Sequence, residues 1–323
     1  MPFELWKRPD ELGQVLTALG ATFPPAERVA LTMTAELCDC YATKAVGVNA
    51  VLDAVLEAFP HAPIRVWGID EEFHDISEVR SRPEVAAAAN WLALALLAAR
   101  LLPEEPGLLI DIGTTSTDLI PLASGHSAAR GRTDTQRLQT GELVYAGMRR
   151  TPVCALATEL PLRGVPTGLA AELFASTLDV YLLLGDIAPD PKDLSTADGQ
   201  PATIAAARDR LARMVGADRN SFTADDARAF ALAADDALMA RLVVAAERAC
   251  VATVGRPRSA VVSGSGEFLA RRLAERMLLP GCERNVISLD EAWGPVASSA
   301  GCAYALLVVA AERHMQIAGA RLS

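Results

Sequence analysis

Residues 108–122 constrain the fold more than any other part of the sequence. Two short apolar runs, at 108–112 and 117–122, are joined by the polar tetrapeptide Gly-Thr-Thr-Ser. Apolar runs of about four to eight residues that end at turn residues are typical of buried β-strands, and a short connection containing glycine is typical of a hairpin. We therefore predict a buried β-hairpin whose turn carries a row of hydroxyl groups.

The turn of this hairpin has the residue types that bind a phosphate chain. Gly113 permits backbone conformations that other residues avoid, and the residues after it supply neutral hydrogen-bond donors. The predicted donors are Thr114, Thr115, Ser116 and Thr117. Asp111 ends the first strand and Asp118 begins the second, so two carboxylates flank the donors and could hold Mg²⁺. An ordinary threonine-rich hairpin is the simpler alternative, and the two flanking aspartates argue against it.

A second glycine turn follows a short apolar strand at 258–263 and precedes a predicted helix at 268–278. Such a turn lets the backbone pass close to a flat ligand such as a nucleobase or a ribose. The residues predicted to contact that ligand are Gly264, Ser265, Gly266 and Glu267. Glycine turns also join strands to helices for steric reasons, so this motif is weak alone. The sequence lacks the P-loop, Rossmann and nucleophile-elbow motifs, which disfavours those folds.

The remaining pattern alternates strands with helices and predicts an α/β protein. Strands are expected at 28–34 and 64–69, and helices at 9–19, 48–59, 85–102, 169–184, 201–215, 224–254 and 295–316. The polar segment 124–141 is predicted to be a long surface loop. Two prolines and a glycine at 103–107 indicate a linker, so we expect one domain at 1–105 and a second at 106–323.

Composition excludes several classes of function. Thirty Lys and Arg residues against forty Asp and Glu give a net charge of −10, and the basic residues form no stripe, so nucleic acid is not an expected partner. The six cysteines contain no C-x-x-C pair, which disfavours a zinc site or a disulfide framework and favours the cytoplasm. The apolar segment 85–102 includes Asn90 and Arg100, so we interpret it as a buried helix rather than a membrane span.

The two turns together resemble those of the sugar kinase, Hsp70 and actin superfamily, and more closely its hydantoinase/oxoprolinase branch. Within that branch the chain is similar to proteins of tetrahydromethanopterin-linked C1 transfer, which are related to an archaeal methanofuran-pathway synthase that joins a furan to a phenol. The residues that carry this closer match lie at 32–39, 43–44, 89–91, 109–121, 131–134, 140–147, 150–152 and 196–199. The resemblance implies a two-lobed, actin-like and ribonuclease H-like α/β fold.

The resemblance also implies a reaction. A phenol oxygen attacks the methylene group of a furfuryl diphosphate, and diphosphate leaves. A small phosphorylated molecule is then the substrate, Mg²⁺ is the expected cofactor, and Asp111 is catalytic as well as a metal ligand. Glu142, Glu36 and Asp39 are the candidates to accept the phenol proton. Lys44 and Arg132 are candidates to pair with phosphate oxygens, although surface positions fit both equally well.

One departure from the superfamily and two alternatives accompany this prediction. Members of the superfamily open with a strand pair that carries an Asp-x-Gly-Gly phosphate loop, and no such loop precedes Met1. We therefore expect a first lobe without its N-terminal strand pair.

One alternative is an ATP-dependent hydantoinase, oxoprolinase or small-molecule kinase. The other is a non-catalytic subunit that binds a nucleotide or metabolite. A homo-oligomer is compatible with all three, and the sequence leaves the oligomeric state open.

Overall fold

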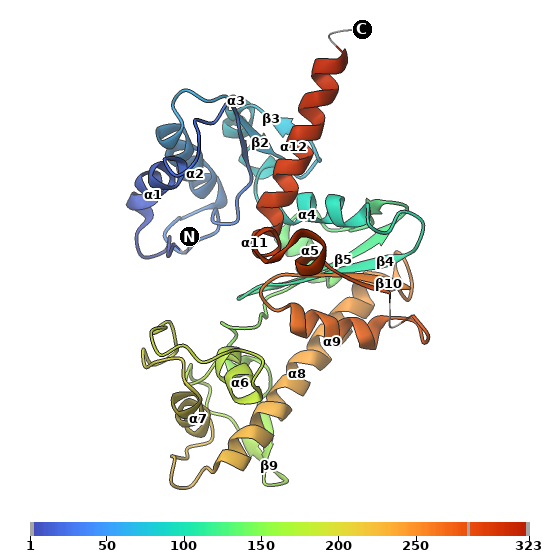
Figure 1. Ribbon diagram of the computed structural model, residues 1–323. Helices are drawn as coiled ribbons and strands as arrows, with labels where there is room; N and C mark the ends of the chain where they lie inside the picture. Colours follow the sequence, from blue (N-terminus) through green and yellow to red (C-terminus); the bar gives the residue numbers. More distant parts are fainter. Residues whose placement is uncertain (1–2, 283–284, 321–323) are drawn as a thin grey trace. The chain divides into compact units, whose positions relative to one another are not determined.

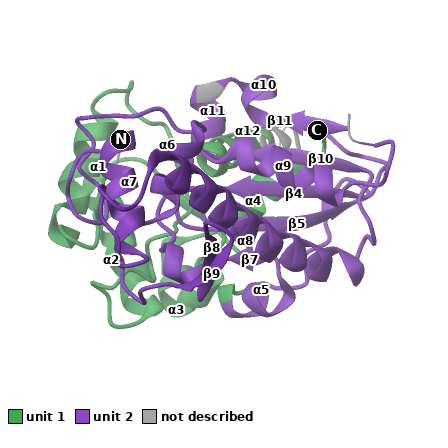
Figure 2. Cartoon of the chain, turned by 90° about the horizontal axis from the view of Figure 1, so that it is seen from below, with its two compact units in different colours: residues 1–100, 132–134, 300–323 green, residues 101–131, 135–299 purple. Residues whose placement is uncertain are grey.

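The computed structural model describes residues 3–282 and 285–320 (Figure 1). The chain forms two compact units (Figure 2). Unit 1 comprises Met1–Arg100, Arg132–Asp134 and Ala300–Ser323, and unit 2 comprises Leu101–Gly131 and Thr135–Ser299. The expected boundary at 105/106 lies close to the change of unit after residue 100. The expectation that the C-terminal segment belongs to the second domain differs from the structure, because the last helix packs in unit 1.

Unit 1 contains a three-stranded sheet in the order β1-β2-β3. The strands are β1 (Val29–Leu31), β2 (Ile64–Trp67) and β3 (Phe73–His74). Strands β1 and β2 are parallel and are connected through α2 (Lys44–Ala58), as the sequence predicted for a strand-helix-strand unit. The hydroxyl of Thr43 accepts the N–H of Val46 at 3.2 Å and thereby caps the start of α2. Buried side chains of α2 and β2 form the core of this unit.

Helices surround this sheet in unit 1. They are η1 (Pro9–Glu11), α1 (Leu12–Gly20), α3 (Ile76–Ser81), η2 (Pro83–Val85), α4 (Asn90–Ala99) and α12 (Gly301–Ala320). The helix predicted at 85–102 is shorter because Ala88 has a φ of 55°, a left-handed conformation that prevents a continuous helix. Helix α12 packs beside α4 (Figure 1), and Arg100 of unit 1 binds Glu312 at 2.8 Å.

The main sheet lies in unit 2, in the order β11-β10-β4-β5-β6 with β7 beside β5. Its strands are β4 (Gly107–Ile112), β5 (Thr117–Ala123), β6 (His126–Ser127), β7 (Leu143–Val144), β10 (Ser259–Ser263) and β11 (Val286–Ser288). Strands β4 and β5 form the predicted hairpin, and β10 and β11 run parallel to β4. The sheet packs against α8 (Ala224–Val251) and α9 (Glu267–Met277).

The other elements of unit 2 show two departures from the sequence analysis. They are α5 (Asp134–Thr140), η3 (Val153–Ala155), β8 (Glu159–Leu162), β9 (Val165–Gly168), α6 (Thr177–Leu184), α7 (Ile204–Arg213), α10 (Leu289–Trp293) and α11 (Pro295–Ser299). The predicted loop 124–141 contains β6 and α5. Within it, Arg137 is only 2% exposed and pairs with the half-buried Asp118. The predicted helix 169–184 begins only at Thr177, where the Ser176 side chain caps it.

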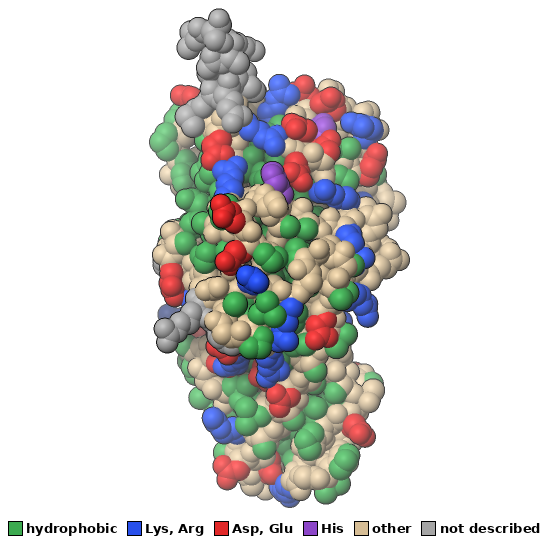
Figure 3. All heavy atoms as spheres, turned by 90° about the vertical axis from the view of Figure 1, so that its right-hand side faces the viewer, with side chains coloured by type: hydrophobic (Ala, Val, Ile, Leu, Met, Phe, Trp, Pro, Cys, Tyr) green, Lys and Arg blue, Asp and Glu red, His purple; other side chains and the backbone are tan. Residues whose placement is uncertain are grey.

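The surface, the helices and the cysteines can be compared with what the composition indicated. Acidic and basic side chains are interspersed with apolar ones over the face in Figure 3. Within the described residues, we find no helix of sufficient length and apolar character to span a bilayer. All six cysteines are free.

Candidate active site

The two glycine turns meet at one edge of the sheet in unit 2. Strands β4 and β10 are parallel, and Asp111 at the end of β4 lies opposite Ser263 at the end of β10. The carboxyl ends of parallel strands share one edge, which is where open α/β sheets bind ligands. The N–H of Gly266 donates to the carbonyl oxygen of Ile112 at 2.8 Å and joins the second turn to the first strand. The structure therefore brings together the two motifs that are about 150 residues apart in the sequence.

The glycines of the second turn permit this close contact. Gly264 has a φ of +91°, and a Cβ atom added to it would lie 2.4 Å from the Ile112 carbonyl oxygen and 2.5 Å from Asp111 Oδ1. A Cβ atom on Gly266 would lie 2.7 Å from the side chain of Ile112. Both positions therefore require glycine so that the turn can pack on β4. The side chain of Ser265 is exposed beside them.

Residues 147–151, which we name the backing segment, support the hydroxyl turn. The N–H of Met148 donates to the carbonyl oxygen of Gly113 at 3.0 Å, and the N–H of Arg150 donates to that of Thr114 at 2.8 Å. A Cβ atom on Gly147 would lie 2.5 Å from the Gly113 carbonyl oxygen. Part of this segment belongs to the residues that resemble the family, but no role in the site was predicted for it from the sequence. The one feature of the sequence that could have indicated this role is Gly147, which lets the backbone lie close to the hydroxyl turn.

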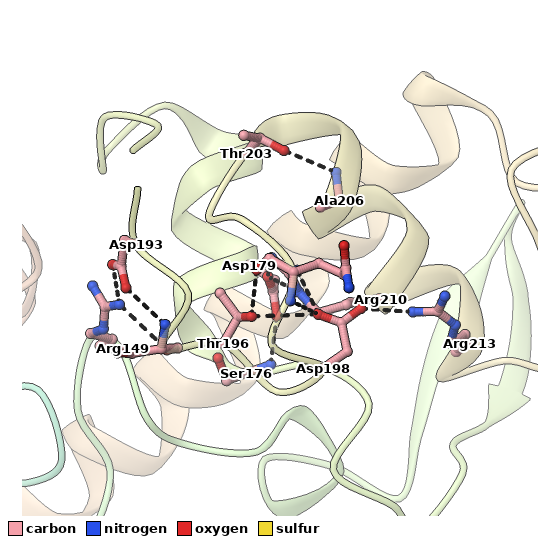
Figure 4. A network of polar contacts seen from close by, with 12 residues as sticks. Arg149, Ser176, Asp179, Asp193, Thr196, Asp198, Thr203, Ala206, Arg210 and Arg213 are labelled. Carbon is pink, nitrogen blue, oxygen red and sulfur yellow. Dashed lines mark hydrogen bonds and ion pairs between the residues drawn. The ribbon is translucent and has the colours of Figure 1, made fainter. Parts of the chain in front are cut away.

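A polar network fixes the backing segment to the helices of unit 2 (Figure 4). Arg149 pairs with Asp193 in the loop that precedes α7. Arg210, which is fully buried, pairs with Asp179 of α6 at 2.6 Å and with Asp198 at 3.0 Å. These pairs join the loop 190–202 to α6 and α7. A buried arginine that binds two carboxylates restricts how far these elements can move apart.

Three of the four predicted hydroxyl donors remain available at the turn. The side chain of Thr114 is exposed, and those of Thr115 and Ser116 are half-buried. Thr117 differs from our expectation, because it is fully buried and its hydroxyl donates to the Ala146 carbonyl oxygen at 2.7 Å. Its role is therefore to hold the hairpin against the chain that leads into the backing segment. The turn itself closes through a bond from the Gly113 N–H to the Ser116 carbonyl oxygen at 2.9 Å.

The two aspartates lie directly opposite each other across β4 and β5. Asp118 Oδ1 accepts a hydrogen bond from Arg137 Nη2 at 2.6 Å. Burial, together with repulsion from Asp118, raises the pKa of Asp111 to about 7, and the hydroxyl of Ser263 offsets part of this rise. Mg²⁺ in proteins is commonly held by one or two carboxylates plus phosphate oxygens and water. Asp111 and Asp118 fit that donor set, since a cation would relieve their repulsion.

The remaining carboxylate candidates have surroundings of their own in each unit. Glu142 is fully buried in unit 2, and its two carboxylate oxygens accept the N–H groups of Arg130 at 2.7 Å and Gly131 at 2.8 Å. Glu142 thus anchors the backbone just before the chain enters unit 1 at residue 132. Glu36 is buried within unit 1, and Asp39 is exposed there.

Three other predicted contact residues are bound within the protein. Lys44 pairs with Asp134 at 2.9 Å, and Arg132 pairs with Glu71 at 3.5 Å, both within unit 1. Glu267 lies at the start of α9 in unit 2, where it accepts the hydroxyl of Ser288 at 2.6 Å and pairs with Arg271 at 3.1 Å. These contacts hold Glu267 between α9 and the end of β11.

Comparison with known proteins agrees with the resemblance. The model of the family Hydantoinase/oxoprolinase matches residues 27–311. A Methanocaldococcus jannaschii protein, (4-{4-[2-(gamma-L-glutamylamino)ethyl]phenoxymethyl}furan-2-yl)methanamine synthase, is 33% identical over 307 residues, which cover 94% of this chain and 88% of that protein. A synthase of the same name from Methanococcus vannielii is 30% identical over 203 residues, 62% of this chain and 89% of its own length.

A solved structure shows the same class of fold. Nucleotide-free acetone carboxylase aligns with a TM-score of 0.51 and 14% sequence identity, over 94% of this chain and 45% of the carboxylase chain. The mixed α/β fold of the present chain is thus shared with part of that enzyme. Because the family model spans most of the sequence and the identity to the Methanocaldococcus jannaschii synthase extends over nearly its whole length, the chain belongs to the hydantoinase/oxoprolinase family.

Proposed function

We propose that the protein is a transferase that joins a phenol to an aminomethylfuran through an ether bond. The observation that carries the proposal is the 33% identity over 94% of the chain to a synthase whose printed product contains this bond. That product joins a phenol bearing a 2-(gamma-L-glutamylamino)ethyl group to a furan bearing a methanamine. The electrophile in our proposal is the furan with a methyl diphosphate group. Its products are the ether and free diphosphate, as in the biosynthesis of a methanofuran-like C1 carrier.

The reaction makes one bond and breaks one. The phenol oxygen forms a bond to the furfuryl methylene carbon while the bond from that carbon to the diphosphate oxygen breaks, and the diphosphate leaves with the electron pair. The electron-rich furan stabilises the positive charge that develops on the methylene group. The phenol proton is taken up by the released diphosphate. The protein therefore has to orient the two reactants and stabilise the leaving group.

The geometry of the hydroxyl turn supports the binding of this leaving group. The chain has a net charge of −10, so a diphosphate must be held against the overall field by local donors and cations. The hydroxyls of Thr114, Thr115 and Ser116 provide such donors in our proposal. Asp111 and Asp118 would hold Mg²⁺, which supplies charge neutralisation to the leaving diphosphate. The proposal therefore includes a two-lobed fold in which the hydroxyl turn binds the phosphate groups.

The decisive experiment combines turnover with binding. The protein is incubated with an aminomethylfuran-methyl diphosphate, gamma-glutamyltyramine and Mg²⁺, and we expect the ether by mass spectrometry with one diphosphate released per ether. We expect Asp111→Asn to abolish Mg²⁺-dependent binding of the diphosphate substrate in calorimetry, while Asp225→Asn, at an exposed position on α8, leaves it unchanged. Unchanged affinity in Asp111→Asn would remove the hairpin from the active site. ATP turnover without ether formation would contradict the proposed reaction.

A further inference from the structure

One exposed aromatic side chain lies where the chain passes the hydroxyl turn of unit 2. Tyr145 directly follows β7 and is 50% exposed, whereas Val144 and Ala146 on either side of it are buried. Single exposed apolar side chains are common on proteins, so exposure alone gives Tyr145 no role. The contacts of its neighbours determine where Tyr145 lies relative to the hydroxyl turn.

Contacts before and after Tyr145 hold its backbone against the hairpin. Val144 is paired with Thr117 where β7 runs beside β5. The carbonyl oxygen of Ala146 accepts the hydroxyl of Thr117 at 2.7 Å. The next residue, Gly147, packs on the turn itself, where a Cβ atom would lie 2.5 Å from a carbonyl oxygen of the turn. The chain is thus bound to the hairpin on both sides of Tyr145.

The register of β5 and β7 indicates which way the Tyr145 side chain points. Directly opposite residues of antiparallel strands point to the same face of a sheet, and successive residues alternate between the faces. The pair Thr117 and Val144 is buried. One step further along both strands, Tyr145 lies opposite Ser116, so these two face the other, more exposed side. The N–H of Ala146 donates to the Val144 carbonyl oxygen at 2.8 Å, and this tight turn is centred on Tyr145.

An aromatic ring beside Ser116 suits the group that the diphosphate carries. In the proposed function, the diphosphate binds at the hydroxyl turn and its ester oxygen is bonded to the methylene group of the furan. The furan ring is therefore attached only two bonds away from that oxygen. The ring of Tyr145 offers a flat apolar surface for another ring, and its electron-rich face attracts positive charge.

We propose that the ring of Tyr145 packs against the furan ring of the substrate and stabilises the positive charge that develops on its methylene group. This inference rests on the proposed function and adds a residue that determines specificity, because a diphosphate without a flat ring would lack this contact. Tyr145, the hydroxyl turn and the segments that join them all belong to unit 2.

Calorimetry on the full-length protein with Mg²⁺ present tests this contact without turnover. Two unreactive probes carry a diphosphate in which a CH₂ group replaces the ester oxygen, and they bear either a furan ring or a methyl group on it. We expect the wild type to bind the furan probe at least about fivefold more tightly than the methyl probe. Tyr145→Leu should reduce this ratio to below about twofold, whereas Tyr145→Phe should keep it because the aromatic ring remains.

A matched control and a further variant complete the binding experiment. Phe174→Leu removes an aromatic ring at a 37% exposed position in the loop before α6 and should leave the ratio unchanged. Tyr145→Trp covers the case in which Tyr145→Leu does not fold: its added indole fluorescence should change with the furan probe and stay constant with the methyl probe. Equal affinity of the wild type for the two probes, an unchanged ratio in folded Tyr145→Leu, or no fluorescence change in Tyr145→Trp would overturn the inference.

Kinetics separate this inference from the proposed function. In the ether-forming reaction, Tyr145→Leu should lower kcat about tenfold and Tyr145→Phe should stay within about twofold of the wild type, because the aromatic face stabilises the developing charge. If the ether forms and Tyr145→Leu keeps the kcat and the probe ratio of the wild type, the ring contact is wrong and the proposed function stands. If the probes bind as described and no ether or diphosphate is released, the contact stands and the proposed reaction fails.

Discussion

Asp111 is a carboxyl group whose protonation state depends on where the fold puts it. It ends a strand in the main sheet and faces Asp118 across the hairpin. Burial and this neighbour favour its neutral form, so its pKa rises to about 7. In the proposed function, a bound cation and a proton would therefore compete for this carboxyl group near neutral pH. This competition couples ligand binding, stability and pH at a single residue.

The raised pKa predicts a particular pH dependence of stability. Asp111 binds its proton more tightly in the folded chain than in the unfolded chain, where its carboxyl has the ordinary pKa of 3.8. Its contribution to stability is therefore complete below about pH 4 and is lost as the pH rises through 7. Between about pH 5 and pH 8, we expect the free energy of unfolding of Asp111→Asn to fall by roughly 1–3 kcal/mol less than that of the wild type. Urea denaturation across this range measures the difference. Asp225→Asn should show the same pH dependence as the wild type. If Asp111→Asn shows it as well, the prediction is wrong.

Substitution of Glu142 is expected to lower the stability of the fold rather than to remove a catalytic group. In Glu142→Gln one carboxylate oxygen is replaced by an amide NH₂ group, which would face a backbone N–H of Arg130 or Gly131. An unsatisfied buried group of this kind costs about 1–3 kcal/mol. Chemical denaturation should show this decrease, whereas the exposed Glu159→Gln should change stability by less than about 0.5 kcal/mol. Equal stabilities for the two variants would show that Glu142 is not an anchor.

At the scale of elements, the site is made by two strand-and-turn units that pack at one sheet edge. The hairpin β4–β5 follows from local apolar runs and its glycine turn, and the structure confirms it. The pairing of β10 with β4 joins distant segments, and no local pattern specifies it. The contact depends on the missing side chain at Gly264, which leaves space for the Ile112 carbonyl oxygen.

Gly264→Ala tests whether this contact between elements matters. The new Cβ atom would lie within 2.4–2.5 Å of the Ile112 carbonyl oxygen and Asp111 Oδ1, so β10 and β4 would have to separate locally. We expect a loss of at least about 2 kcal/mol in unfolding free energy and weaker Mg²⁺-dependent diphosphate binding. Gly185→Ala is the control, because Gly185 also has a positive φ, of +82°, but has open space around its Cα. It should cost only about 1 kcal/mol, and equal effects on binding in both variants would contradict the prediction.

At the scale of the whole molecule, the chain leaves unit 1, builds unit 2 and returns. Residues 132–134 and the C-terminal segment both belong to unit 1 (Figure 2). Helix α12 completes unit 1 by packing on α4, and Leu306 is only 3% exposed there. Arg313 adds contacts to the ring of Trp67, at 5.2 Å from its centroid, and to Glu72 at 3.0 Å. The last helix therefore contributes to the stability of the first unit.

Adjacent leucines on α12 test this assignment. Leu306→Ala removes a buried side chain and should lower the unfolding free energy by about 2–4 kcal/mol, whereas Leu307→Ala, whose side chain is 63% exposed, should change it little. Hydrogen exchange should show that Leu306→Ala reduces protection in α2 and α4 of unit 1 and leaves β10 and α9 of unit 2 protected. Loss of protection in unit 2 alone would mean that the helix stabilises the other unit.

Features that depend on neighbouring residues could be predicted from the amino-acid sequence alone. Apolar periodicity and capping residues predicted α2, α8 and the hairpin, because these elements satisfy their hydrogen bonds locally. The hydroxyl turn and its two aspartates were identified in the same way, and their roles in binding stay predictions. Local patterns missed the hairpin β8–β9 and the break at Ala88, where tertiary contacts outweigh weak propensities.

The folded structure was needed to show which candidates share a site. It joined Asp111 to the second glycine turn, engaged Thr117 and Glu142 in internal hydrogen bonds, and assigned Glu36 to unit 1. It also showed that the C-terminal helix belongs to unit 1. A carboxylate has the same chemistry in the sequence whether it becomes a ligand, an anchor or an acceptor. Its role depends on burial and on partners far along the chain, and those are set when the chain folds.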